Sequence, residues 1–136
     1  MKEFLVALFL FPMLMWFPCQ DVAGQINHSK VVAYTAIVDK HAQAARIEGC
    51  FTTSNINSLK LELSNALYLN VADIQFTGDS SPKYRTDVFN QSQMIHFKVS
   101  VPIKKFLANS SFWGISESSN QVNYSMENEV ASELLP

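Results

Sequence analysis

The strongest hydrophobic pattern of the chain lies in its first 47 residues. Apolar residues run without a charge from Phe4 to Pro18. A polar joint over residues 19–30 follows. From Val31 to about Ile47, apolar residues then recur at the three- and four-residue spacing of a helix. This pattern predicts one long N-terminal helix that is apolar at its start and amphipathic towards its end.

The amphipathic part of this helix has an apolar stripe that contains several small residues. The stripe comprises Val31, Tyr34, Val38, Ala42 and Ala45. Such a stripe is typical of a helix that faces its own core, and the alanines would also let another helix approach closely. We therefore expect part of the first helix to pack on sister subunits. The residues expected to serve helix packing and assembly are Val32, Ala33, Ala36, Val38, Ala42 and Ala45.

A second helix is predicted from about Ser54 to Tyr68. Gly49 can take a left-handed conformation at little cost and is expected to end the first helix. The Thr, Ser and Asn residues after it are N-cap types. Because the connection is short, the two helices should be antiparallel neighbours. We expect the apolar face of the second helix to meet the Val38–Ala45 stripe. That face carries Leu59, Leu63 and Leu67.

The remaining sequence predicts a small antiparallel sheet of about three strands. The segments that alternate between apolar and polar residues are 71–77, 93–101 and 120–127. Phe97 and Val99 lie on the core-facing side of the second segment, and Pro102 is expected to end it. Residues 83–92 predict a loop, and residues 103–118 predict a connection that covers an edge of the core. The expected fold class is therefore α+β, with a long N-terminal helix, a second helix and this sheet.

Two roles fit the apolar start of the chain. As a helix, residues 4–18 would extend for about 22 Å, less than the ~30 Å hydrocarbon core, and such a run is as typical of a signal peptide as of a membrane span. The small residues of Val22–Gly24 offer a cleavage site, whereas Trp16 at the far end of the run favours a retained anchor. We expect residues 1–20 to form a transmembrane anchor or signal segment and residues 21–136 an extracytoplasmic α+β domain.

Neither the charge nor the motifs of the sequence indicate a catalytic or ligand-binding site. The 136 residues carry a net charge of −2, which gives no argument for nucleic-acid binding. The three histidines lack metal-ligand spacing, and no phosphate-binding, dinucleotide-binding or nucleophile motif occurs. Cys19 and Cys50 would lie too far apart for a disulfide if the segment between them is mostly helical. We therefore expect no catalytic, cofactor-binding or metal-binding residues.

The layout resembles that of a known bacterial family. An apolar N-terminal segment leads into a helix that ends in Ala44-Ala45-Arg46-Ile47-Glu48-Gly49, and a second helix with a Thr/Ser cap precedes a small strand region. This arrangement is similar to TadE-like minor pseudopilins and related small pilus-assembly proteins. The resemblance implies a pilin-like fold in which the N-terminal helix anchors the protein and packs into a filament or secretion complex.

The resulting expectation is a structural protein rather than an enzyme. Its partners would be membrane lipid and other pilin-like or envelope-assembly subunits that contact the N-terminal helix. The domain after the anchor would lie outside the cytoplasm. The alternative is a secreted or periplasmic α+β binding module that is released by signal-peptide cleavage.

Overall fold

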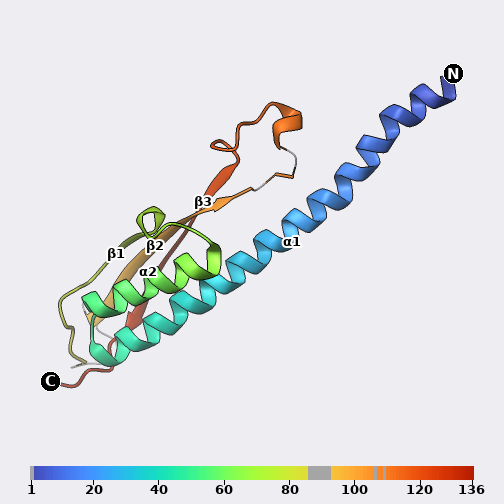
Figure 1. The fold of residues 1–136 in the computed structure, drawn as a ribbon. Coiled ribbons are helices and arrows are strands. Elements are labelled where there is room, and N and C mark those ends of the chain that lie inside the picture. The colour runs from blue at the N-terminus through green and yellow to red at the C-terminus, as the bar shows by residue number, and fades with distance from the viewer. Residues whose placement is uncertain (1, 86–92, 106, 109) are drawn as a thin grey trace. The chain divides into compact units, whose positions relative to one another are not determined.

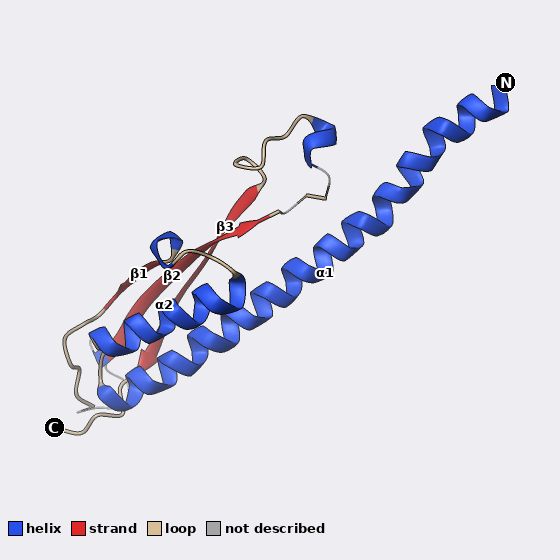
Figure 2. Cartoon of the chain, viewed as in Figure 1, coloured by secondary structure: helices blue, strands red, loops and turns tan. Residues whose placement is uncertain are grey.

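The computed structural model describes residues 2–85, 93–105, 107–108 and 110–136 (Figure 1). The predicted loop over 83–92 therefore lies outside the described residues from residue 86 onward. The helices and strands are α1 (Lys2–Glu48), α2 (Thr53–Leu67), β1 (Gln75–Gly78), β2 (Met94–Lys104) and β3 (Gln121–Ala131). Two short 3₁₀ turns are also described, η1 (Val71–Asp73) and η3 (Ser110–Trp113). These elements confirm the predicted α+β class, with two helices and one three-stranded sheet (Figure 2).

The chain forms two compact units. The first, which we call the N-terminal unit, combines Met1–Ser29 with Ile103–Val122. The second, which we call the core unit, combines Lys30–Pro102 with Asn123–Pro136. The hydrophobic core lies entirely within the core unit, since its first buried member is Tyr34 and its last is Val101.

Helices cover one face of the sheet in the core unit (Figure 2). Strand β2 supplies every second residue to this core, because successive side chains of a strand point to opposite faces. The buried residues of β2 are Ile95, Phe97, Val99 and Val101. Helix α2 supplies residues spaced four apart, which lie on one face of a helix. They are Leu59, Leu63 and Leu67, and they belong to the same cluster as Val38, Ala42 and Ala45 of α1.

Strand β2 is the central strand of the sheet. It pairs antiparallel with β1, from Gln75 opposite Ser100 to Gly78 opposite Phe97. On its other side, β3 is its neighbour. Ion pairs join Lys98 to Glu127 and His96 to Glu129, so residue numbers rise along β2 as they fall along β3. The third strand is thus antiparallel to the second, as the sequence predicts.

The first strand is shorter than predicted. Its expected first residues form η1, in which the amide of Asp73 donates to the carbonyl of Asn70 at 3.0 Å. Extended pairing begins only at Gln75. The alternation over 71–77 predicts one strand, but the same pattern fits a turn that buries only Ile74.

The prediction that Pro102 ends the second strand is wrong, because β2 continues to Lys104. The amide and carbonyl of His96 point towards β1, where they contact Asp79. Pro102 lies six residues later, so its nitrogen points to the same side. The last residue of β2 that pairs with β1 is Ser100. The missing N–H of Pro102 therefore removes no hydrogen bond to β1.

The connection between α1 and α2 has the predicted chemistry. Gly49 has a φ of 78°, in the left-handed region that the sequence predicts for it. Thr52 caps α2, and its hydroxyl accepts a hydrogen bond from the amide of Asn55 at 3.3 Å. Because these two signals lie only three residues apart, they set the boundaries of both helices to within about two residues of the prediction.

The prediction that residues 103–118 cover an edge of the core is wrong. Ile103–Val122 belongs to the N-terminal unit, and none of its described residues is in the core cluster. Asn120 shapes this connection from within. Its side chain accepts from the amide of Leu107 at 2.7 Å and donates to the carbonyl of Leu107 at 2.8 Å. The amide of Lys105 also donates to the carbonyl of Asn120 at 2.9 Å, so Asn120 joins the two ends of the connection.

Candidate membrane and assembly surface

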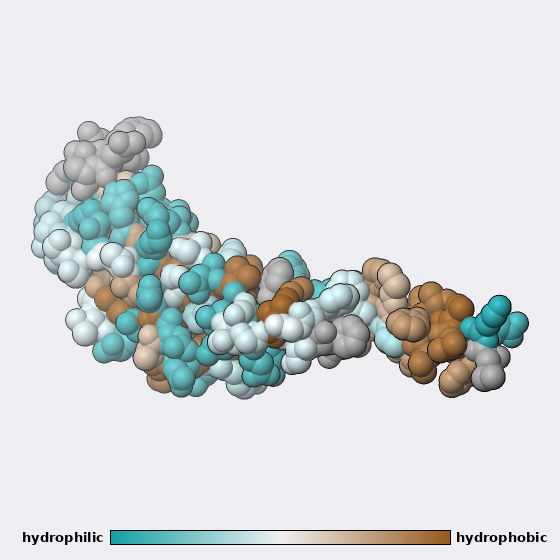
Figure 3. Space-filling view, turned by 90° about the horizontal axis from the view of Figure 1, so that it is seen from above, coloured by the Kyte–Doolittle hydropathy of each residue, from teal (hydrophilic) through white to brown (hydrophobic). Residues whose placement is uncertain are grey.

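The first four turns of α1 expose a continuous apolar surface. Within Phe4–Phe17, every large aliphatic or aromatic residue except Trp16 is at least half exposed. Among the described residues, α1 is the one helix that is long and apolar enough to cross a membrane, and no part of its apolar window is buried. Figure 3 shows this surface as a brown zone at the N-terminal end of the helix. A membrane anchor and a signal sequence both have this character.

Helical structure suits this segment to a bilayer. The run is uncharged from Phe4 to Gln20, which at ~1.5 Å per residue spans about 26 Å, close to a hydrocarbon core of ~30 Å. Helical hydrogen bonds satisfy the backbone there without water. Pro12 and Pro18 lie inside the helix and lack the N–H that an inner turn would use, a feature that membrane helices tolerate.

Three of the predicted assembly residues remain accessible on α1. Val32 is 54% exposed, Ala36 is exposed and Ala33 is half-buried. Val32 and Ala36 are four residues apart and therefore lie on one face of the helix. The small side chain of Ala36 allows close approach of another helix. This accessible pair is the part of the predicted surface that a second subunit can reach.

For the other three predicted assembly residues, the structure corrects the prediction. Val38, Ala42 and Ala45 are 0–3% exposed and belong to the core cluster of their own domain. A side chain with no accessible surface cannot contact another subunit in this conformation. Their spacing was compatible with both roles, because a helix that packs on its own sheet and one that packs on a neighbour show the same periodicity.

The predicted intramolecular core residues all lie in the buried cluster. Leu59, Leu63 and Val99 are fully buried, and Leu67 and Phe97 are at most 6% exposed. They therefore hold α2 and β2 against the second half of α1 and do not form a ligand site.

A buried polar contact fixes α2 on α1. Nδ1 of His41 lies 2.5 Å from Oδ1 of Asn55, and Nδ2 of Asn55 donates to the carbonyl of His41 at 3.1 Å. Because the amide nitrogen of Asn55 is used in this way, its oxygen must accept, and His41 therefore donates through Nδ1. Glu62 lies 3.5 Å from Nε2 of His41 and accepts from Lys40 at 2.7 Å. The group therefore joins the two helices through side chains of both.

Sequence reasoning missed Phe51 and Asn55. Phe51 is 1% exposed, and its ring centroid lies 5.1 Å from that of Phe97. A signal for Phe51 exists, since an apolar residue directly before an N-cap often packs near the fourth helical residue, here Ile56. Asn55 gives no such signal, because its partner His41 comes from another helix.

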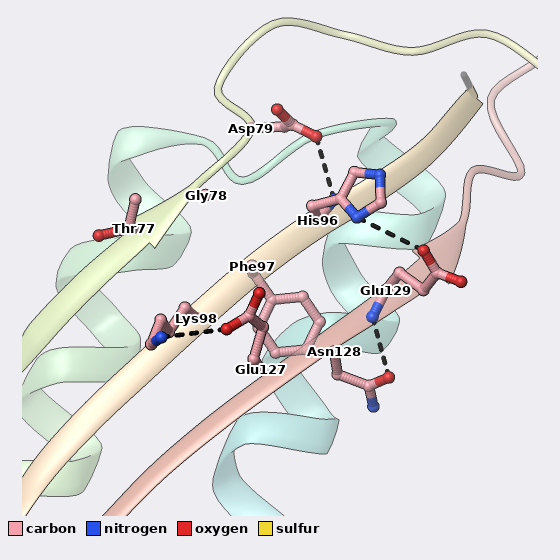
Figure 4. A pocket seen from close by; sticks show the side chains of 9 residues that line it. All are labelled: Thr77, Gly78, Asp79, His96, Phe97, Lys98, Glu127, Asn128 and Glu129. Atoms are coloured by element: carbon pink, nitrogen blue, oxygen red, sulfur yellow. Dashed lines mark hydrogen bonds and ion pairs between the residues drawn. The ribbon is translucent and has the colours of Figure 1, made fainter. Parts of the chain in front are cut away.

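The outer face of the sheet carries a shallow hollow of about 590 Å³ (Figure 4). Charged side chains line it in pairs. Lys98 lies 3.0 Å from Glu127, and Nδ1 of His96 lies 3.4 Å from Glu129. These four side chains are more than half exposed. Paired, solvated charges of this kind are typical of an open sheet face rather than of a catalytic centre.

Asp79 is another charged residue that lines the hollow. It accepts from Nζ of Lys83 at 2.5 Å and from the amide of His96 at 3.0 Å. The hydrogen bond from Lys83, with that from His96, lowers the pKa of the Asp79 carboxyl below its ordinary value of 3.8. Lys83 also donates to the carbonyl of Met94 at 2.6 Å, so the pair ties the turn after β1 to the start of β2.

No metal centre is formed by the part of the chain that the structure describes. No three His, Cys, Asp or Glu side chains there are grouped to hold an ion. Both cysteines are free; Cys19 is exposed and Cys50 is buried.

Comparison with protein-family models, curated proteins and solved structures finds no match. Among the described residues, the exposed apolar part of α1 is the main candidate for a functional surface.

Proposed function

We propose that the chain is a structural, membrane-anchored subunit of the pseudopilin-like kind, in a pilus or secretion-type assembly of the cell envelope. One observation carries the proposal: the exposed apolar run Phe4–Phe17 belongs to the same helix that supplies core residues to a folded domain. Exposed in water, such a run would favour aggregation. A bilayer and neighbouring helices would cover it. The resemblance to TadE-like proteins adds support to this proposal.

The accessible part of α1 beyond the anchor is the proposed contact with other subunits. Val32 and Ala36 present one apolar and one small side chain on one face, and the small residue Ala33 close to that face is half-buried. Interfaces between anchored helices are commonly built from such small residues. The partners would be further copies of this chain or similar anchored subunits.

The test is disulfide crosslinking in native membranes. Val32→Cys and Ala36→Cys are made in a background with Cys19→Ser and Cys50→Ala, followed by mild oxidation and non-reducing electrophoresis. We expect each variant to form a crosslinked dimer, or an adduct with another anchored subunit carrying a matching cysteine. The control is Asn65→Cys, an exposed position on α2, which should remain uncrosslinked.

Absence of crosslinks at both α1 positions, in cells whose envelope assembly is complete and working, would overturn the assembly role. Equal crosslinking of Asn65→Cys would also count against it, because random collision would then explain the products.

A secreted α+β binding module is the second candidate. The core cluster begins at Tyr34, so cleavage after Gly24 would leave every core residue in the released domain. The small residues of Val22–Gly24 fit such a cleavage site. In that case the apolar run would serve only for export.

A further inference from the structure

We propose that the β2–β3 connection forms a second membrane contact, with Trp113 in the headgroup region of a phospholipid bilayer. This inference rests on the anchoring proposed above. It assigns a role to residues 103–118, whose described members belong neither to the core nor to the proposed subunit contact.

Two contacts hold the connection to the end of the apolar run. The ring centroids of Trp16 and Trp113 are 6.0 Å apart with an interplanar angle of 74°, an edge-to-face pair. The amide of Ala108 donates to Oε1 of Gln20 at 3.2 Å. All four residues belong to the N-terminal unit.

These contacts set the depth of Trp113. Gln20 is the last residue of the uncharged run that begins at Phe4, and Asp21 follows it. Trp16 lies four residues before Gln20, about 6 Å along the helix axis. If α1 spans the bilayer, Trp16 therefore lies near the boundary between acyl chains and headgroups. Trp and Tyr side chains are enriched at this depth because they combine an apolar ring with a hydrogen-bonding group. Through its contact with Trp16, Trp113 lies near the same depth.

The composition of the connection fits a membrane surface. No charged residue occurs between Lys105 and Glu117. Trp113 is 57% exposed, although it contacts Trp16. Lys104 and Lys105 are exposed where the connection begins. Two lysines in the same connection as an exposed tryptophan suit an anionic membrane, since basic residues near the surface are attracted to acidic headgroups.

An apolar hollow next to this contact points to lipid as the occupant. It has a volume of about 810 Å³ and is lined on one side by α1 residues that include Leu8, Pro12 and Met13, and on the other by Ser111 and Trp113. Leu8 lies twelve residues before Gln20, about 18 Å along the helix axis. This is the depth of acyl chains in a bilayer that holds the anchor, so the hollow would be filled by phospholipid chains.

The experiment measures the depth of each tryptophan separately. Full-length Trp16→Phe and Trp113→Phe variants each retain one tryptophan, and Phe preserves an aromatic ring at the changed site. They are reconstituted into vesicles of phosphatidylcholine and phosphatidylglycerol, with or without lipid brominated on the acyl chains near the headgroup. We expect brominated lipid to quench Trp113 to a similar extent as Trp16, and both to be shielded from aqueous iodide.

Quenching of Trp16 together with full exposure of Trp113 to iodide would overturn the second contact and leave the anchor intact. If neither tryptophan is quenched, both proposals fall. Quenching of Trp113 alone would contradict the shared depth and overturn the inference.

A second readout avoids any change at the aromatic pair. A polarity-sensitive nitrobenzoxadiazole dye is attached to Ser111→Cys in the background without Cys19 and Cys50. Its emission should shift to shorter wavelength when the protein is in vesicles. The same dye at Ser118→Cys, an exposed position beyond the uncharged stretch, should not shift. Equal emission from the two sites would overturn the membrane contact.

Discussion

Gly49 shows how one residue allows two distant segments to pack against the end of α1. Its φ of 78° suits glycine, and a β carbon at this position would lie 2.7 Å from Cδ2 of Leu134 and 2.9 Å from the carbonyl oxygen of Lys83. The amide of Lys83 donates to the carbonyl of Gly49 at 2.9 Å. Arg46 nearby forms an ion pair with Glu133. Two distant segments thus close over the end of α1 because Gly49 has no side chain.

We predict that Gly49→Ala lowers the free energy of unfolding by more than about 1 kcal/mol, because backbone strain and steric overlap act together. Urea denaturation followed by circular dichroism measures the change. Gly24→Ala is the matched control, since a β carbon there meets no atom within 4 Å and alanine favours a helix by up to about 1 kcal/mol. Equal stability of the two variants would contradict the close approach of Leu134 to Gly49.

Asp79 makes the stability of the core unit depend on pH. Its hydrogen bond from Lys83 holds the carboxyl pKa below 3.8, so the folded state favours the charged form. For a carboxyl whose folded pKa is lowered, the stabilisation is complete above the ordinary pKa. It is lost as the pH falls through the lowered value.

Asp79→Asn should therefore lower the free energy of unfolding at neutral pH by about 1 kcal/mol, since the charge-assisted bonds are lost at a partly exposed site. The difference from the wild type should shrink as the pH falls below 3.8. Urea titrations at several pH values measure it. Glu127→Gln, at a carboxylate that is 74% exposed, should change stability by no more than about 0.5 kcal/mol at neutral pH. A difference for Asp79→Asn that persists unchanged in acid would contradict this role for the charge.

At the scale of elements, the contact between α2 and α1 holds the core unit together. Leu63 is fully buried in the core, whereas Lys60 on the same helix is partly exposed. Leu63→Ala should cost about 2–5 kcal/mol of unfolding free energy, the range for large-to-small changes in a core. Lys60→Ala should stay within about 0.5 kcal/mol. Chemical denaturation compares them, and equal stabilities would mean that the assignment of faces on α2 is wrong.

Most helix boundaries could be predicted because their causes are local. Gly49 ends α1 through its left-handed backbone, and Thr52 starts α2 through its side-chain cap. Both roles are the ones that these residue types predict. Strand boundaries depended on partners. Pro102 fits within β2 because the pairing of β2 with β1 extends only as far as Ser100, which the sequence of β2 does not reveal.

The candidate surface was predictable in position but not in detail. The apolar run from Phe4 was evident from composition alone, because its residues are apolar on every side of the helix. Periodicity did not separate the exposed Val32 and Ala36 from the buried Val38 and Ala42. That distinction depends on which side of α1 meets the sheet and α2. The contact between Trp16 and Trp113 joins residues far apart in the sequence, and no local pattern indicates it.

At the scale of the whole molecule, the two units contribute different surfaces. The core unit contains the buried cluster. The N-terminal unit contains the exposed apolar part of α1 and the β2–β3 connection with Trp113. A folded domain whose leading helix carries an uncovered apolar run needs a bilayer, a partner or removal of that run. The proposed anchor retains this run, and the proposed released module loses it.

Fractionation of the full-length protein, with the intact mass determined in each fraction, decides between them most directly. Cells expressing the complete chain are lysed, the membranes are washed with alkaline carbonate, and mass spectrometry is applied to the pellet and the supernatant. If α1 is a retained anchor, the protein will stay in the pellet with a mass that includes the apolar run from Phe4 to Pro18. A soluble protein that begins near Gln25 would contradict the anchor and favour the secreted module.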